Sequence, residues 1–117
     1  MNKHQTKRRD IVSFDKSTSS NIIFSQPDKY RTLENISKNS DKIINVGSNL
    51  SYSPLGFSEN SLSIEVKKFN RILSFDKKRK LITVEAGLTL IELLSFTLKH
   101  NLWIPQLPGY PTITIGG

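Results

Sequence analysis

The segment that most constrains the fold is the run of ten residues PGYPTITIGG at positions 108–117. Alternating β-branched residues are typical of a strand, so residues 112–115 are predicted to be extended and paired. Gly116 and Gly117 have no Cβ, and glycines directly after a strand indicate close approach of the backbone to another group. Such a segment suits a flat ligand lying against peptide groups. A proline-rich connection to a further strand is the alternative interpretation.

Hydrophobic periodicity predicts an α+β chain with the order strand, helix, strand, loop, three strands, helix, loop, strand. Residues 71–86 form a predicted β-hairpin with a basic tip, KKRK. No internal repeat is found. The predicted strands are residues 21–24, 41–46, 61–66, 71–76, 81–86 and 112–115, and the predicted helices are residues 28–39 and 89–100.

Both predicted helices have candidate caps. Asp28 follows Pro27 and is a plausible N-cap of the first helix. Thr89 with Glu92 three residues later forms a capping box for the second helix. His100 and Asn101 follow its last apolar residue, where a helix is expected to end.

The composition limits the class of protein. At 117 residues, 36% hydrophobic and 23% charged, the chain has the size and balance of one folded domain. Its longest apolar stretches, NIIF and LTLIELL, are far shorter than the roughly 20 residues that span a bilayer. There is no secretory leader pattern. The absence of cysteine excludes disulfides and thiolate chemistry and fits a reducing compartment, so we expect a cytoplasmic protein.

The net charge of +7 is concentrated in two places. Residues 1–19 begin with a basic stretch and are expected to be a flexible segment. Residues 67–80 contain seven Lys or Arg against one Asp. A solvated hairpin tip with a flexible tail explains this pattern. The alternative is a module that binds nucleic acid or an anionic surface through Lys67, Lys68, Arg71 and Lys77–Lys80; only Phe69 and Phe75 are aromatic there, so nucleic acid is not favoured.

A second glycine-containing segment, NVGSNLSYSPLG at positions 45–56, follows a predicted buried strand. Small residues leave consecutive backbone N–H groups open, and such a turn can hold phosphate oxygens. Serine hydroxyls add donors. The segment lacks the Gly-Lys-Ser/Thr of a Walker loop and the GxGxxG of a dinucleotide fingerprint. An ordinary polar loop is the alternative.

Other chemistry is not indicated by the sequence. His4 lies in the expected tail and His100 at a helix end, so neither is placed for catalysis. The acidic residues have no paired spacing typical of a metal site or of general acid–base catalysis. We name no catalytic residue and no metal ligand.

The order and spacing of these pieces resemble a known family. The SY-containing loop is followed by NRILSFD, then VEAGLTLIELL, then LWIPQLPGYPTITIGG. Over residues 20–117 this is similar to the N-terminal subdomain of the PCMH-type FAD-binding domain of the vanillyl-alcohol oxidase family, most like aldonolactone oxidases and decaprenylphosphoryl-ribose oxidase. Those proteins typically carry Arg-Gly-x-Gly-x-Ser-Tyr-Gly-Asp in the first segment and Pro-Gly-x-x-x-Val-Thr-Val-Gly-Gly-Ala in the second.

The resemblance implies a fold, a cofactor and a set of contacts. The fold would be an incomplete first subdomain, a small mixed sheet with two helices. The first segment would hold the FAD pyrophosphate and the second would line the flavin and ribityl chain. Leu50 occupies the position at which some members attach FAD through histidine, so noncovalent binding is expected. The residues implied are Gly47, Ser48, Asn49, Leu50, Ser51 and Tyr52 in the first segment, and Gly109, Thr114, Ile115, Gly116 and Gly117 in the second.

This sequence departs from the family pattern in the first segment. Val46 replaces the arginine, Asn49 replaces the second glycine, and Ser53-Pro54 replaces Gly-Asp. These differences weaken the assignment of the pyrophosphate contacts.

The resemblance also implies a function. The parent protein would be an oxidoreductase that moves a hydride from the alcohol carbon of a sugar, lactone or polyprenyl-linked sugar to FAD. The family pattern continues beyond Gly117, so the chain is expected to be truncated. The site would then need the C-terminal portion or a complementing chain, and the 117 residues alone are expected to be inactive. A non-functional truncated gene product is a further alternative.

Overall fold

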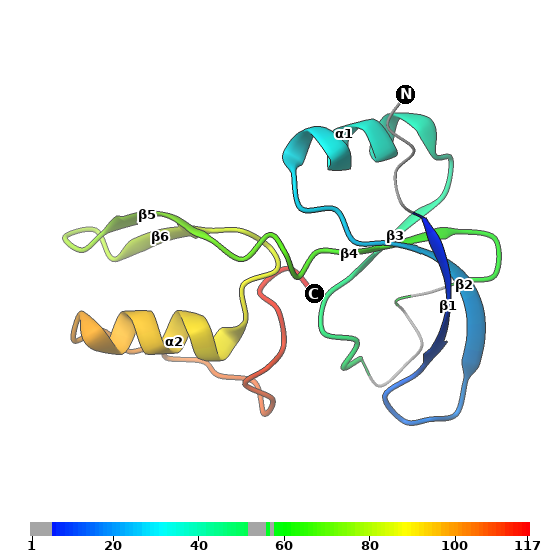
Figure 1. Cartoon of the computed structure of the whole chain (residues 1–117). Helices are drawn as coiled ribbons and strands as arrows, with labels where there is room; N and C mark the ends of the chain where they lie inside the picture. The colour runs from blue at the N-terminus through cyan, green and yellow to red at the C-terminus, as the bar shows by residue number, and fades with distance from the viewer. Residues whose placement is uncertain (1–5, 52–55, 57) are drawn as a thin grey trace.

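The computed structural model of the chain describes residues 6–51, 56 and 58–117, and Figure 1 shows their arrangement. A four-stranded sheet has the order β1-β2-β4-β3. β1 is antiparallel to β2, whereas β2 and β3 are both parallel to β4. The strands are β1 (Lys7–Val12), β2 (Ser19–Ser25), β3 (Ile43–Val46) and β4 (Leu62–Glu65).

Helix α1 (Tyr30–Asn39) connects β2 to β3. The remaining elements form a second layer beside the sheet, in which helix α2 (Leu90–Lys99) lies along the hairpin of β5 (Ile72–Asp76) and β6 (Leu81–Val84) (Figure 1). Phe75 of β5 packs edge-on against Phe96 of α2, with ring centroids 5.2 Å apart. The predicted α+β class, a small mixed sheet with two helices, is confirmed.

Strand β1 differs from the flexible segment expected for residues 1–19. It pairs with β2 over its whole length, and its Ile11 packs against the buried Ile22 and Phe24. Four of its six residues are charged, so the strand has little of the hydrophobic pattern by which strands are predicted. It lies at the edge of the sheet, where charged side chains are common. Arg9 covers the ring of Phe24, with its guanidinium carbon 5.1 Å from the ring centroid.

The two helices begin differently. In α2 the predicted capping box is confirmed: Thr89 Oγ1 accepts from the Glu92 N–H, and Glu92 accepts from the Thr89 N–H. In α1 the predicted Asp28 cap is wrong, because the N-cap position is Lys29 and its side chain makes no capping hydrogen bond. Ile36 is the buried residue of α1, so burial of an apolar side chain, rather than a cap, stabilises this helix.

The carboxylate of Glu85, which follows β6, connects the two layers. It accepts hydrogen bonds from the Arg71 N–H at 2.7 Å, from the Arg71 guanidinium at 2.7 Å, and from the Tyr30 hydroxyl at the start of α1. The guanidinium of Arg71 lowers the pKa of Glu85 from 4.5 to about 2, although burial opposes this. Tyr30 also stacks on the buried Phe69, with centroids 5.3 Å apart.

The C-terminal segment runs between the two layers, as Figure 1 shows. The predicted strand at 112–115 is wrong: the segment forms only an isolated bridge between Thr114 and Thr89. The N–H of Ile115 donates to the Leu88 carbonyl at 2.8 Å, and the N–H of Leu90 donates to the Ile113 carbonyl at 2.9 Å. Extended pairing stops there because the partner backbone turns into α2 at Leu90.

Candidate functional site

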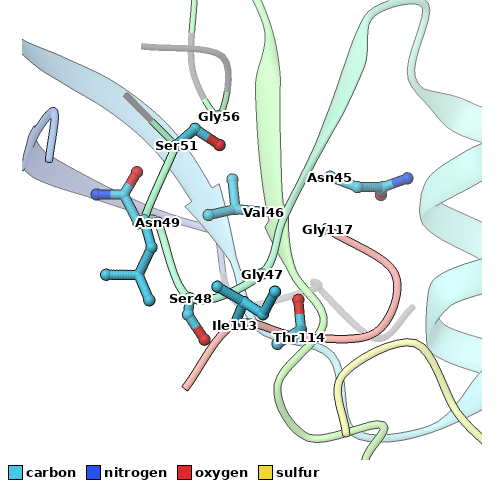
Figure 2. A pocket seen from close by; sticks show the side chains of 11 residues that line it. Asn45, Val46, Gly47, Ser48, Asn49, Ser51, Gly56, Ile113, Thr114 and Gly117 are labelled. Atoms are coloured by element: carbon cyan, nitrogen blue, oxygen red, sulfur yellow. The ribbon is translucent and has the colours of Figure 1, made fainter. Parts of the chain in front are cut away.

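A pocket of about 380 Å³ opens at the C-terminal end of β3, between residues 47–51 and residues 113–117 (Figure 2). The two segments are more than 60 positions apart in the sequence. Parallel strands place the residues that follow them at one edge of a sheet, which is a common location for ligand sites. The lining residues are Asn45, Val46, Gly47, Ser48, Asn49, Leu50, Ser51, Gly56, Ile113, Thr114 and Gly117.

The backbone of residues 47–51 presents five consecutive N–H groups. Within the described part of the chain, none of these five groups donates a hydrogen bond to protein. Asn49 has a φ of 56°, in the left-handed region that glycine and asparagine tolerate best. A turn with successive unpaired N–H groups forms a positively polarised concavity that binds anions. Tyr52, Ser53 and Pro54 lie outside the described residues.

Two side chains fix the position of this loop. The hydroxyl of Ser48 donates to the Thr112 carbonyl at 2.5 Å, and the amide of Asn49 donates to the Val12 carbonyl at 2.9 Å. The Ser48 hydroxyl was expected to donate to a phosphate, whereas here it donates its proton to the protein. The contribution of Ser48 to an anion is therefore limited to its backbone N–H and to what its oxygen can accept.

The floor of the pocket contains a buried hydroxyl. Thr114 is 3% exposed, and its Oγ1 has no hydrogen-bond partner among the described residues. Figure 2 shows Thr114 beside Gly47 and Gly117. A Cβ on Gly47 would lie 2.0 Å from Thr114 Oγ1, and a Cβ on Gly117 would lie 2.9 Å from it. Glycine at both positions therefore lets the backbone of both segments lie directly against this hydroxyl.

The structure brings together most of the predicted site residues. Of the residues predicted in the second segment, however, only Thr114 and Gly117 line this pocket. Gly116 instead packs on Ala86, where a Cβ would lie 2.6 Å from the Ala86 Cβ. Ile115 is exposed, and Gly109 has no atom within 4 Å of a Cβ built on it. The five residues from the first segment that line the pocket as expected are Gly47, Ser48, Asn49, Leu50 and Ser51.

Four lining residues were not predicted from the sequence: Asn45, Val46, Gly56 and Ile113. Asn45 and Val46 are the last residues of β3, so their position at the strand end was the available signal. Gly56 packs close to Val46, where a Cβ would lie 3.2 Å from Val46 Cγ2. Nothing in the sequence indicated that Ile113 would face this pocket.

The basic residues proposed as an alternative surface are divided among several partners. Arg71 is bound to Glu85, Arg79 is paired with Asp76 at 2.7 Å, and Lys67 is 3.8 Å from Glu65. Lys68 lines a separate pocket with residues 7–9 rather than with the hairpin tip. Within the described ranges there is no cluster of metal-ligating side chains and no helix long and apolar enough to cross a membrane.

The comparisons with known proteins identify the class. A protein family described as an FAD binding domain matches residues 26–117, so the chain belongs to this family. The chain also superposes on cholesterol oxidase from Brevibacterium sterolicum (His121Ala mutant) with a TM-score of 0.85 at 16% identity, covering 100% of this chain and 24% of that one. The chain thus belongs to an FAD-binding family and has the fold of a PCMH-type FAD-binding domain.

Particular relatives are found among sugar and lactone oxidases. The chain is 37% identical over 75 residues to decaprenylphosphoryl-beta-D-ribose oxidase of Mycolicibacterium smegmatis, covering 64% of this chain and 16% of that protein. It is 41% identical over 54 residues to L-gulonolactone oxidase of Mus musculus, covering 46% of this chain and 12% of that protein. The chain therefore spans less than a fifth of the length of these relatives.

The residues present fit the cofactor that the family implies. FAD carries an anionic pyrophosphate, and residues 47–51 offer consecutive N–H donors. FAD also carries several hydrogen-bonding groups, and Thr114 Oγ1 is a buried hydroxyl in need of a partner. The glycines beside it remove the Cβ atoms that would fill the pocket.

Proposed function

We propose that the chain binds FAD, noncovalently, in the pocket between residues 47–51 and residues 113–117. One observation carries this proposal: five N–H groups and the Thr114 hydroxyl, none of which has a partner among the described residues, lie at one pocket. The N–H groups of the first segment hold the pyrophosphate, as successive amides do in other anion sites. Leu50 offers no nucleophile for attachment of the flavin.

The second segment contributes to the same site by its backbone and by one hydroxyl. Thr114 donates to, or accepts from, the bound cofactor, and Gly117 allows close approach beside it. Gly109, Ile115 and Gly116 belong to the same family motif, and we assign them to the surface that faces the flavin and ribityl chain. FAD, when bound, supplies the capacity to accept a hydride.

We further propose that the whole protein oxidises an alcohol carbon of a sugar, lactone or polyprenyl-linked sugar. The support is the resemblance to decaprenylphosphoryl-beta-D-ribose oxidase and L-gulonolactone oxidase, whose names describe such substrates. No residue of this chain is assigned as the catalytic base. The substrate class is tested by adding candidate sugars and lactones anaerobically to the FAD-loaded whole protein and measuring the loss of oxidised-flavin absorption.

Cofactor binding is tested on the purified whole protein. FAD is added, unbound FAD is removed by gel filtration, and the visible spectrum is recorded. We expect flavin absorption to elute with the protein in a 1:1 ratio and to separate from it after denaturation. A protein fraction without flavin contradicts the binding proposal, and flavin that remains attached after denaturation contradicts the noncovalent assignment.

A further inference from the structure

The hairpin of β1 and β2 contacts both segments of the candidate site. The family match begins at residue 26, so this hairpin lies before the part of the chain that the family defines. It nevertheless contacts each of the two segments that form the pocket. The Asn49 side chain donates to the carbonyl of Val12, the last residue of β1, and Phe14 packs edge-on against Tyr110 with ring centroids 5.4 Å apart.

The turn that makes these contacts, residues 13–18, is internally fixed. Ser13 is 3% exposed; its N–H donates to the Thr18 carbonyl at 2.8 Å, and its hydroxyl accepts from the Thr18 N–H at 3.1 Å. The Ser13 hydroxyl donates in turn to Asp15 at 2.5 Å. The β1–β2 pairing holds both ends of the turn. The turn and the two paired strands therefore fix the positions of the Val12 carbonyl and the Phe14 ring.

Asn49 connects the β1–β2 hairpin to the loop of residues 47–51. It is the non-glycine residue of the loop with a positive φ, 56°, and its side chain is bonded across to β1 at 2.9 Å. A left-handed residue is disfavoured unless its surroundings hold it. The hydrogen bond to Val12 supplies that restraint, and the conformation of Asn49 in turn sets the directions of the N–H groups around it.

From these contacts we infer that the N-terminal hairpin is a working part of the cofactor site: through Val12 and Asn49 it holds residues 47–51 in the anion-binding conformation before FAD arrives. Asn49 and Ser13 are positioning residues in this scheme. The inference rests on the proposed function for its ligand, but the ordering of the loop does not depend on FAD. A preorganised loop binds more tightly because less conformational entropy is lost on binding.

The test replaces Asn49 by glycine, which accepts a positive φ freely and lacks only the side-chain amide. Asn101→Gly is the matched control, because Asn101 has a nearly identical φ of 59° but lies at the end of α2. Two quantities are measured: the dissociation constant for FAD, and the hydrogen exchange of the amides of residues 47–51 without FAD. Ser13→Ala, which loosens the turn without altering the loop, is the second variant.

We expect Asn49→Gly to weaken FAD binding about fivefold and to speed exchange in residues 47–51 by a similar factor, which is the effect of losing one hydrogen bond. Ser13→Ala changes both quantities in the same direction, and Asn101→Gly changes neither. If Asn49→Gly binds FAD as tightly as the unaltered protein and its loop exchanges no faster, the inference is wrong. If the unaltered protein binds no FAD, the proposed function fails, and the exchange data alone decide the inference.

Discussion

A single buried hydroxyl carries much of the chemical argument at the residue scale. Leaving a buried polar group without a partner costs on the order of 1–3 kcal/mol. Thr114 Oγ1 is such a group among the described residues, and it lies where Gly47 and Gly117 leave room. A cost to the free protein that a ligand can relieve is typical of a binding site.

Replacing Thr114 by valine tests this interpretation, because valine keeps the shape and removes the hydroxyl. We expect the FAD-free protein to gain about 1 kcal/mol in its free energy of unfolding and FAD to bind at least fivefold more weakly. Thr112→Val is the matched control, since Thr112 is exposed and uses its carbonyl, not its hydroxyl, toward Ser48. Urea denaturation and FAD titration provide the two values. Unchanged FAD affinity in Thr114→Val contradicts a role for the hydroxyl.

The residue types at positions 47–51 predicted an open backbone, but they did not predict which residues this loop would bond to. The small residues at positions 47–51 indicated an open backbone, which the structure bears out within its described ranges. The sequence analysis treated Asn49 as a weakening departure from glycine, whereas its φ of 56° is one that asparagine tolerates. That Ser48 and Asn49 would bond to Thr112 and Val12 could not be predicted, because those contacts depend on tertiary placement.

At the scale of elements, the Glu85 carboxylate connects α1 to the hairpin that carries α2. Its side chain is 2% exposed and it is bonded to both Arg71 and Tyr30. Because its pKa is lowered to about 2, the carboxylate stabilises the fold fully above its ordinary pKa of 4.5. This contribution is lost as the pH falls from about 4.5 toward 2.

Glu85→Gln removes the charge and keeps the shape. We expect a loss of about 2 kcal/mol in the free energy of unfolding at pH 7, since hydrogen bonds to a charged group are being weakened. Between pH 4.5 and 2 the difference from the unaltered protein should shrink, because in this range the unfolded chain binds a proton at Glu85 that the folded protein takes up only near pH 2. Glu34→Gln is the control: its exposed pair with Lys38 is worth little, so a change within about 0.5 kcal/mol is expected. A pH-independent difference for Glu85→Gln contradicts the assigned role.

The capping box of α2 is a second element-scale feature that reaches the site, because Thr89 also forms the bridge to Thr114. Thr89→Ala is expected to lower the free energy of unfolding by about 1 kcal/mol, and Thr89→Ser to recover most of it. Thermal denaturation of the three proteins checks this expectation. Equal midpoints for Thr89→Ala and the unaltered protein show that the cap does not stabilise the fold.

Elements whose signal lies in neighbouring residues of the sequence could be predicted. Elements that depend on pairing with distant residues could not. The α2 capping box and the 72–84 hairpin depend on nearby residues and are confirmed. Strand β1 is held by β2 despite its charged sequence, so periodicity did not indicate it. The β-branched residues 112–115 have strand propensity, but the backbone that they pair with turns into α2 at Leu90. Tertiary context therefore overrides propensity in this segment.

At the scale of the whole molecule, the site exists only because the fold joins distant segments. Gly47 lies at the end of the sheet, directly after β3. The segment after α2 returns between the two layers and places Thr114 and Gly117 beside Gly47 (Figures 1 and 2). The family relationship accounts for this arrangement, since the match covers both segments. The account therefore requires that both segments act on one ligand.

The measurement that tests this requirement most directly is the dissociation constant for FAD of Gly47→Ala beside that of Ser74→Ala. A Cβ at position 47 would lie 2.0 Å from Thr114 Oγ1 and must force the two segments apart, whereas Ser74 is an exposed residue of β5 that does not line the pocket. Overpacking of this kind costs about 1–3 kcal/mol, so we expect Gly47→Ala to bind FAD at least tenfold more weakly and Ser74→Ala to bind it unchanged. Equal FAD affinity in the two variants, or no FAD binding by the unaltered protein, would contradict the account.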